Sequence, residues 1–103
     1  MSGTRLTLIV SVWLRDGDVA GFEAFESKVA KIQAKHGGRI ERAIRLTPRD
    51  SDEQPFELHI VSFPDEGSLA AYRADEAMQA LGPERERLIA RTVIVEGRDV
   101  PPY

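Results

Sequence analysis

The sequence predicts an α+β fold of the ferredoxin-like type, in which two helices pack on one face of a four-stranded antiparallel sheet. Four segments have the apolar alternation of strands, and two segments with helical spacing lie between the first and second strands and between the third and fourth. This β-α-β-β-α-β order, with a central hairpin and right-handed crossovers, favours the split βαβ sandwich. A chain of 103 residues has room for one core, so we expect a single domain over residues 1–103.

The first strand is predicted over residues 6–15, where two different faces alternate. One face is uniformly aliphatic: Leu6, Leu8, Val10, Val12 and Leu14. The other mixes apolar and polar groups: Thr7, Ile9, Ser11, Trp13 and Arg15. We expect the aliphatic face to lie on the main core.

A helix is predicted from the Asp16-Gly17-Asp18 turn to about His36, because either aspartate can cap the free amides of a first turn. Its apolar residues recur at spacings of three and four: Phe22, Phe25, Val29 and Ile32. Gly37-Gly38 is expected to end the helix, since glycine adopts the left-handed conformation at little steric cost.

Two further strands are predicted over residues 39–47 and 56–63, joined by a polar loop over 48–55 that prolines bound. In the second strand Arg42 is expected to share a face with three aliphatic residues: Ile40, Ile44 and Leu46. In the third strand one face carries Phe56, Leu58, Ile60 and Ser62, and the other carries Glu57, His59, Val61 and Phe63.

A second helical region follows Pro64, with an imperfect apolar stripe that Asp75 can interrupt by capping a fresh turn. Gly82-Pro83 is expected to stop this helix, and residues 87–96 are expected to contain the last strand. The tail from Gly97 to Tyr103 is predicted to be irregular, and it can reach toward a partner.

With both helices on one face, the opposite face of the sheet is left bare. It is expected to carry Ile9, Trp13, Val61 and Phe63, or their neighbours of opposite parity. An apolar face of this kind needs cover, and the simplest cover is the same face of a second copy. The sequence therefore predicts a homodimer.

Composition excludes several classes of function. The net charge is −3 and no basic stripe occurs, so we expect no nucleic-acid partner. No apolar run approaches 18 residues, and the N-terminus lacks the pattern of a signal peptide, so we expect a cytoplasmic protein without a membrane partner. There are no cysteines, and the two histidines lack metal-ligand spacing, so we expect no metal and no cofactor.

Two runs of the chain resemble a known group. The run SVWLRDGDVAGFEAFESKVAKIQAKHGGRI is similar to the first half of the dimeric α-β barrel superfamily, and closest to a bacterial family of uncharacterised proteins of about a hundred residues. The second half resembles the same family through Phe63-Pro64, Tyr72, Asp75-Glu76, Arg87 and Glu96-Gly97. The resemblance implies the barrel fold.

The resemblance leaves function open, because the superfamily includes cofactor-free monooxygenases, haem-degrading enzymes, muconolactone-type isomerases and small stress-induced barrels. The haem-degrading members use an asparagine together with a tryptophan and a histidine. This chain contains no asparagine, which argues against that activity.

His59 is the candidate catalytic residue, because a neutral imidazole in a cavity can act as a base. If it points to the bare face, that cavity lies between the sheet and a partner. The candidate ligand-binding residues are Trp13, Ser11, Arg42 and Tyr72. Each also has a structural interpretation: a tryptophan packs an interface, an arginine pairs across strands, and a tyrosine lines a core.

Three hypotheses follow. The protein is a dimeric barrel that binds an apolar or aromatic small molecule, a cofactor-free monooxygenase or isomerase that uses His59, or a structural or regulatory barrel with no ligand. A cavity of roughly 300 Å³ or more, lined by His59 and Trp13, is expected of the first two.

Overall fold

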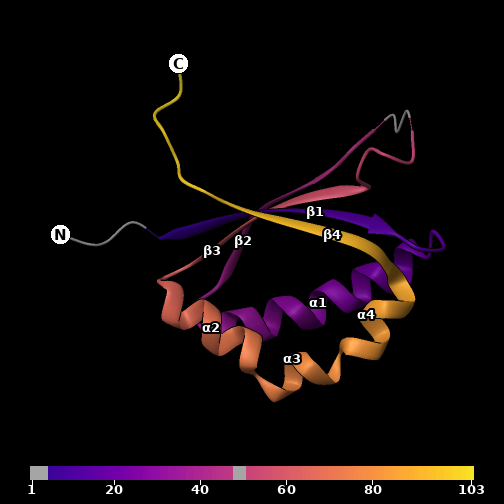
Figure 1. Cartoon of the computed structure of the whole chain (residues 1–103), viewed down its shortest axis with the longest axis horizontal. Helices are drawn as coiled ribbons and strands as arrows, with labels where there is room; N and C mark the ends of the chain where they lie inside the picture. The colour runs from indigo at the N-terminus through magenta and orange to yellow at the C-terminus, as the bar shows by residue number, and fades with distance from the viewer. Residues whose placement is uncertain (1–4, 48–50) are drawn as a thin grey trace.

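The computed structural model describes residues 5–47 and 51–103 and confirms the predicted order of strands (Figure 1). The second helical region is divided into three short helices. The elements are β1 (Leu6–Leu14), α1 (Val19–Lys35), β2 (Arg39–Arg45), β3 (Glu57–Phe63), α2 (Glu66–Ala74), α3 (Glu76–Ala80), α4 (Gly82–Leu88) and β4 (Ile89–Gly97).

The four strands form one antiparallel sheet in the order β2-β3-β1-β4, which confirms the ferredoxin-like fold. All four helices lie on one side of the sheet, while the tail that follows β4 rises on the other side (Figure 1). We call the side of the sheet that packs against the helices the covered face and the opposite side the open face. No described helix is long and apolar enough to cross a membrane.

The core lies between the covered face and the helices, as the alternation in β1 predicted. Leu8 and Val12 are buried there. They pack into two clusters whose other buried members come from α1, β3, the later helices and the start of β4: Phe22, Phe25, Val29, Val61, Phe63, Leu69, Leu88 and Ile89.

The helix ends follow the predicted capping chemistry. Asp18 caps α1, with its Oδ1 accepting a hydrogen bond from the amide of Gly21 at 2.9 Å. Gly37 follows α1 with a φ of 76°, a conformation that favours glycine. Asp75 ends α2 and caps α3, because its Oδ1 accepts a hydrogen bond from the amide of Ala77 at 2.8 Å.

Gly82-Pro83 ends one helix and begins another, which the sequence analysis did not predict. Leu81 terminates α3, and Pro83 lies in the first turn of α4, where the absence of an amide hydrogen has no cost. The residues up to Leu88 are therefore helical, and β4 begins only at Ile89.

The first expectation for β3, that Val61 and Phe63 lie on the bare face of the sheet, is wrong. Both residues lie in the core. Val61 pairs with Leu8 and His59 pairs with Val10, so these residues share the covered face with the aliphatic side of β1. Leu58 and Ile60 consequently point to the open face. The imidazole of His59 lies under the helices.

A β-bulge in β2 also corrects the expected grouping of Arg42 with Ile40. The register shifts between these two residues, so Ile40 pairs with Val61 of the covered face while Arg42 pairs with Ile60 of the open face. Ile44, opposite Leu58, lies on the open face as well.

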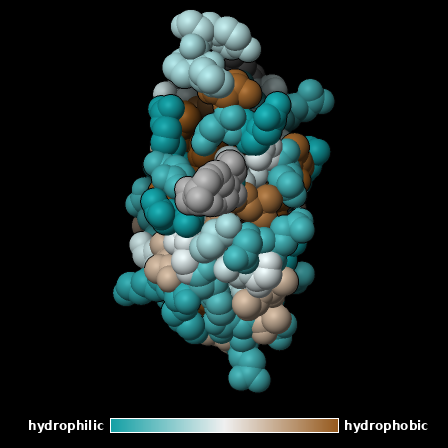
Figure 2. All heavy atoms as spheres, turned by 90° about the vertical axis from the view of Figure 1, so that its left-hand side faces the viewer, coloured by the Kyte–Doolittle hydropathy of each residue, from teal (hydrophilic) through white to brown (hydrophobic). Residues whose placement is uncertain are grey.

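The open face carries an apolar surface that the described chain leaves uncovered. Ile9 of β1 is 38% exposed and its partner Val95 of β4 is 54% exposed. In Figure 2 the most hydrophobic colours gather at and above the level of the sheet, whereas the lower, helical half is mainly hydrophilic. This is the face for which the sequence predicted a partner.

Candidate functional site

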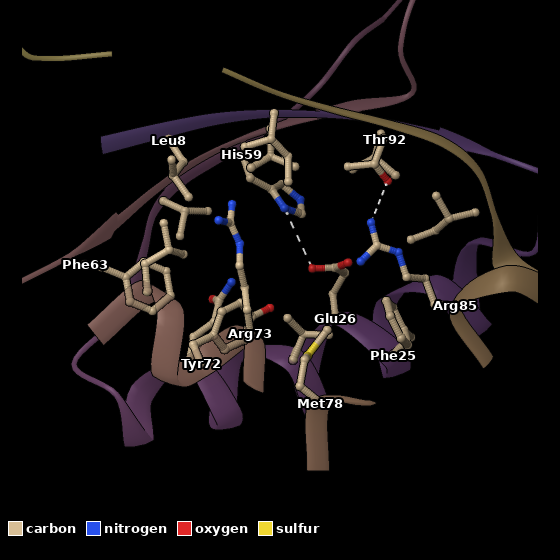
Figure 3. Close-up of a pocket in the computed structure, with 18 residues that line it drawn as sticks. Leu8, Phe25, Glu26, His59, Phe63, Tyr72, Arg73, Met78, Arg85 and Thr92 are labelled. Carbon is tan, nitrogen blue, oxygen red and sulfur yellow. Dashed lines mark hydrogen bonds and ion pairs between the residues drawn. The ribbon is translucent and has the colours of Figure 1, made fainter. Parts of the chain in front are cut away.

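A cavity of about 80 Å³ lies between the covered face and the helices (Figure 3). Its wall is mostly apolar. The polar and charged side chains that reach it are Glu26, Gln33, His59, Tyr72, Arg73, Arg85 and Thr92. Buried polar side chains need partners, so their contacts show how this cavity is organised.

His59 is held by a carboxylate and an arginine behind it. Its Nε2 lies 2.5 Å from Oε2 of Glu57, two residues earlier on the same face of β3. Arg45 of β2, which pairs with Glu57 across the strands, donates to Oε1 of that carboxylate through Nε at 3.0 Å and Nη2 at 2.8 Å. Since a carboxylate only accepts, the hydrogen on Nε2 of His59 is the one donated to Glu57.

The second ring nitrogen of His59 faces Glu26 of α1. Nδ1 lies 3.7 Å from Oε1 of that carboxyl group, longer than a hydrogen bond (Figure 3). In a neutral ring whose Nε2 donates to Glu57, Nδ1 carries the basic lone pair. The site thus directs a basic nitrogen and a carboxyl group toward each other at the cavity wall.

Burial raises the pKa of Glu26 above its ordinary value of 4.5. His59 opposes this rise when its ring is protonated, and so does the positive charge of Arg85, while the nearby charge of Glu57 adds to the rise. A carboxyl group with a raised pKa holds its proton at a higher pH than usual. It is therefore better suited to give or take a proton near neutral pH.

Aromatic rings fix the plane of the imidazole. The ring of Phe22 stacks on His59 with centroids 6.4 Å apart and planes at 29°. Phe56 meets Phe22 edge-on at 5.8 Å, and the guanidinium of Arg45 lies 4.7 Å from the centre of the Phe56 ring. The imidazole is thus oriented by a hydrogen bond at one edge and by packing on its face.

The structure brings together two of the five residues proposed from sequence, His59 and Tyr72, which line the same cavity. Burial raises the pKa of the Tyr72 hydroxyl above its ordinary value of 10.0. Ser11 and Arg42 lie on the open face, which the sheet separates from this cavity.

Trp13 lies apart from His59, in a shallow hollow near the end of β1. Its Nε1 donates to the backbone oxygen of Glu53 at 3.2 Å, and the guanidinium of Arg91 lies 4.5 Å from the ring centre. The expected cavity of 300 Å³ lined by both His59 and Trp13 is therefore absent from the described chain. The cavity lined by His59 measures about 80 Å³ and lies on the covered face of the sheet.

Glu26 is not among the site residues predicted from the sequence, although its position on α1 is unusual for a glutamate. It follows Phe22 by four residues and precedes Val29 by three, so it lies within the apolar stripe of the helix. Gln33 lies four residues after Val29 on the same stripe, and its Oε1 is buried without a hydrogen-bond partner among the described residues. Polar residues inside an apolar stripe are the pattern that could have identified both.

The site does not have the composition of a metal centre. Within residues 5–47 and 51–103 no group of three or more histidine and acidic side chains is arranged to hold an ion. Its charges occur instead as a linear series of neighbouring groups: Glu26, His59, Glu57, Arg45 and Glu23.

Similar solved structures come from bacterial proteins of comparable length. Protein PA3566 of Pseudomonas aeruginosa has a TM-score of 0.73 and 19% identity over 98% of this chain and 99% of its own. A putative antibiotic biosynthesis monooxygenase from Nitrosomonas europaea has a TM-score of 0.72 and 11% identity, covering 99% and 96%. A dabb family protein with a ferredoxin-like fold from Mesorhizobium loti has a TM-score of 0.69 and 13% identity, covering 96% and 100%.

No protein-family model matches the chain, and no curated protein matches it in sequence. At these identities the likeness establishes the fold alone. The ferredoxin-like fold expected from the sequence is confirmed by these similarities.

Proposed function

We propose that this protein binds a small, largely apolar molecule in the cavity and transfers a proton to or from it at His59. The observation that carries the proposal is the geometry of one buried side chain. The His59 imidazole is 4% exposed, its Nε2 is bound to Glu57 at 2.5 Å, and its Nδ1 is directed at Glu26 on the cavity wall.

The cost of this arrangement supports a functional origin. Glu57 and His59 are both buried, in a core that apolar residues could fill at least as favourably. Buried ionisable groups cluster at sites where their protonation is used, so their presence in a cavity wall favours a catalytic role over a packing role.

The chemistry suited to the site is proton abstraction from a carbon next to a carbonyl group, or from a hydroxyl group. Nδ1 of His59 takes the proton, and Glu57 stabilises the imidazolium that forms. In an isomerisation the same proton returns to another carbon, so the step needs no oxidant. Tyr72, on the same wall, is a donor for the developing oxyanion.

The proposal is tested by exchange of deuterium from D2O into a panel of small enolisable ketones, followed by proton NMR. We expect the protein to accelerate exchange, and His59→Ala to lose at least about 100-fold of that acceleration, the usual contribution of a general base. His36→Ala is the matched control, because His36 also binds a carboxylate, Asp75 at 2.8 Å, but does not line the cavity. Exchange that persists in His59→Ala would remove His59 from the mechanism.

The small volume of the cavity favours a second candidate function, a structural barrel without a ligand. About 80 Å³ holds a few water molecules, whereas ligand pockets usually measure about 300–1,000 Å³. A crystal structure of the purified protein distinguishes the two: ordered waters alone support the structural barrel, and a co-purified organic molecule supports ligand binding.

We also propose that the protein is a single-domain homodimer whose open faces pack together. Ile9 and Val95 supply exposed apolar area on this face, and a soluble protein rarely leaves such a patch uncovered. Light scattering at micromolar concentration is expected to give twice the mass of the chain, and a stable monomer would contradict this proposal.

A further inference from the structure

Two arginines reach the cavity without a carboxylate bound to them. Arg85 of α4 donates from Nη2 to Oγ1 of Thr92 at 3.1 Å, and no described carboxylate lies within ion-pair distance of it. Arg73 of α2 forms no hydrogen bond or ion pair with any described residue. A guanidinium beside an apolar cavity without a bound carboxylate is a ready partner for an anion.

The two arginines lie on either side of His59 where the cavity opens. Figure 3 shows Arg73 rising from α2 toward the sheet and Arg85 extending from α4 toward Thr92 of β4, with Glu26 and His59 between them. Arg73 is exposed, and Ile94 of β4, another lining residue, is 47% exposed, so this side of the cavity is open to solvent. A molecule that enters here meets a positive charge on each side.

The rest of the cavity wall is mainly apolar. Its apolar residues include Leu8, Val10, Val61, Phe63 and Leu69. This combination selects a molecule with an apolar body and one charged end.

Glu26 is the negative group that opposes an anion here. Its pKa is raised because the carboxyl group is buried, so the neutral form is easier to reach than for an exposed glutamate. Glu57 lies behind His59 and is neutralised by Arg45 at 2.8 Å. Arg85 also acts on the charge of Glu26, so this one carboxyl group offsets part of the positive charge of the two arginines. The charge at the opening that remains to be matched by a ligand is positive.

We propose that the ligand is a small apolar acid, bound as its anion, with its carboxylate between Arg73 and Arg85 and its apolar body in the cavity. This inference rests on the proposed function, since it names the class of molecule that the cavity takes. It makes Arg73 and Arg85 the residues that determine specificity for an anion, whereas His59 transfers the proton.

The experiment uses three probes of almost the same shape that differ in charge and suit a cavity of about 80 Å³: propionate, propionamide and propionamidinium. Binding to the full-length protein is followed by amide NMR titration, which also shows whether the shifted resonances surround the cavity. We expect propionate to bind at least about tenfold more tightly than propionamide, equivalent to about 1.4 kcal/mol, and propionamidinium to bind most weakly. The Arg73→Gln/Arg85→Gln variant is expected to reduce the preference for propionate to less than about threefold, while Arg87→Gln, on an exposed side chain of the same helix α4, leaves it unchanged.

Each outcome has a defined meaning. If propionamide binds in the cavity as tightly as propionate, or propionamidinium binds more tightly, the anion assignment is wrong and the apolar cavity of the proposed function remains. Propionate shifts that lie outside the cavity also overturn the assignment. If none of the three probes binds, both the assignment and the proposed ligand cavity are wrong.

Discussion

The first four residues of β3 have the reverse of the usual arrangement, and the last part of the strand has the usual one. On a sheet with one side packed on helices, the polar residues are expected to point outward. Here Glu57 and His59 face the helices, 7% and 4% exposed, while Leu58 and Ile60 point to the open face, where they are half-buried. The apolar Val61 and Phe63 that follow lie in the core. The ionisable residues are thus placed where burial is most costly.

The proposed function gives each face a separate role. Burying Glu57 and His59 lowers the stability of the fold unless their mutual contacts recover the lost hydration, which favours the proton transfer proposed for them. The exposed apolar residues of the open face favour the proposed homodimer, because a second copy would remove them from water.

The largest effect is expected from placing charges on the open face. Ile9→Glu/Val95→Glu introduces two acidic residues per subunit, and a two-fold interface brings all four together. Like charges placed together in an interface cost several kcal/mol, so the proposed dimer is expected to dissociate at least about 100-fold more readily. The mass measured by light scattering across a concentration series checks this.

Ile94→Glu is the matched control for the open face. Ile94 precedes Val95 on the same strand and is similarly exposed, but it points to the helix side and lines the cavity. The same charge is expected to leave the mass unchanged there. If Ile94→Glu dissociates the dimer and Ile9→Glu/Val95→Glu does not, the two faces have been assigned the wrong roles.

A smaller effect is expected from breaking the buried series of charges on the covered face. Glu57→Ala leaves His59 and Arg45 without their shared acceptor, and removing one member of a buried pair costs about 3–5 kcal/mol. Because solvent reaches Arg45, we expect a loss of about 2 kcal/mol and a fall in Tm of about 10 °C. Urea unfolding provides the measurement. Glu96→Ala, at an exposed position of β4, should change stability by less than about 0.5 kcal/mol.

The sequence determined the order of the elements and the core side of β1, but it could not determine the orientation of β3. Both sets of alternating residues in β3 contain apolar side chains, so alternation does not show which set faces the core. The usual cost of burying Glu57 and His59 favours the wrong set. The pairing of Val61 with Leu8 decides it, and that contact joins strands far apart in the chain.

Arg42 and Glu26 show two further limits. The bulge that turns Arg42 to the open face depends on how β2 pairs with β3, and nothing in the local sequence specifies it. Glu26 could be placed on the apolar stripe of α1 from spacing alone, but its role became visible only when β3 placed His59 opposite to it at 3.7 Å. Long-range pairing, which sequence patterns do not encode, created the site from residues of separate elements.

The smallest predicted effect is a gain in stability and concerns Glu26. Its pKa is raised in the folded protein because the carboxyl group is buried, so the folded state binds the proton more tightly than the unfolded state does. Stability contributed by the protonated group is present at low pH and is lost as pH rises from the ordinary value of 4.5 through the folded pKa. Glu26→Gln is neutral at every pH and avoids this loss. We therefore expect its Tm at pH 7 to exceed that of the unmodified protein by roughly 2–5 °C, and the difference to disappear near pH 4.

Glu23→Gln, at an exposed site one turn earlier, should show no comparable gain. A variant that is stabler and yet slower in deuterium exchange is the behaviour expected of a residue kept for function, whereas a loss of stability at pH 7 would show that Glu26 is there to stabilise the fold.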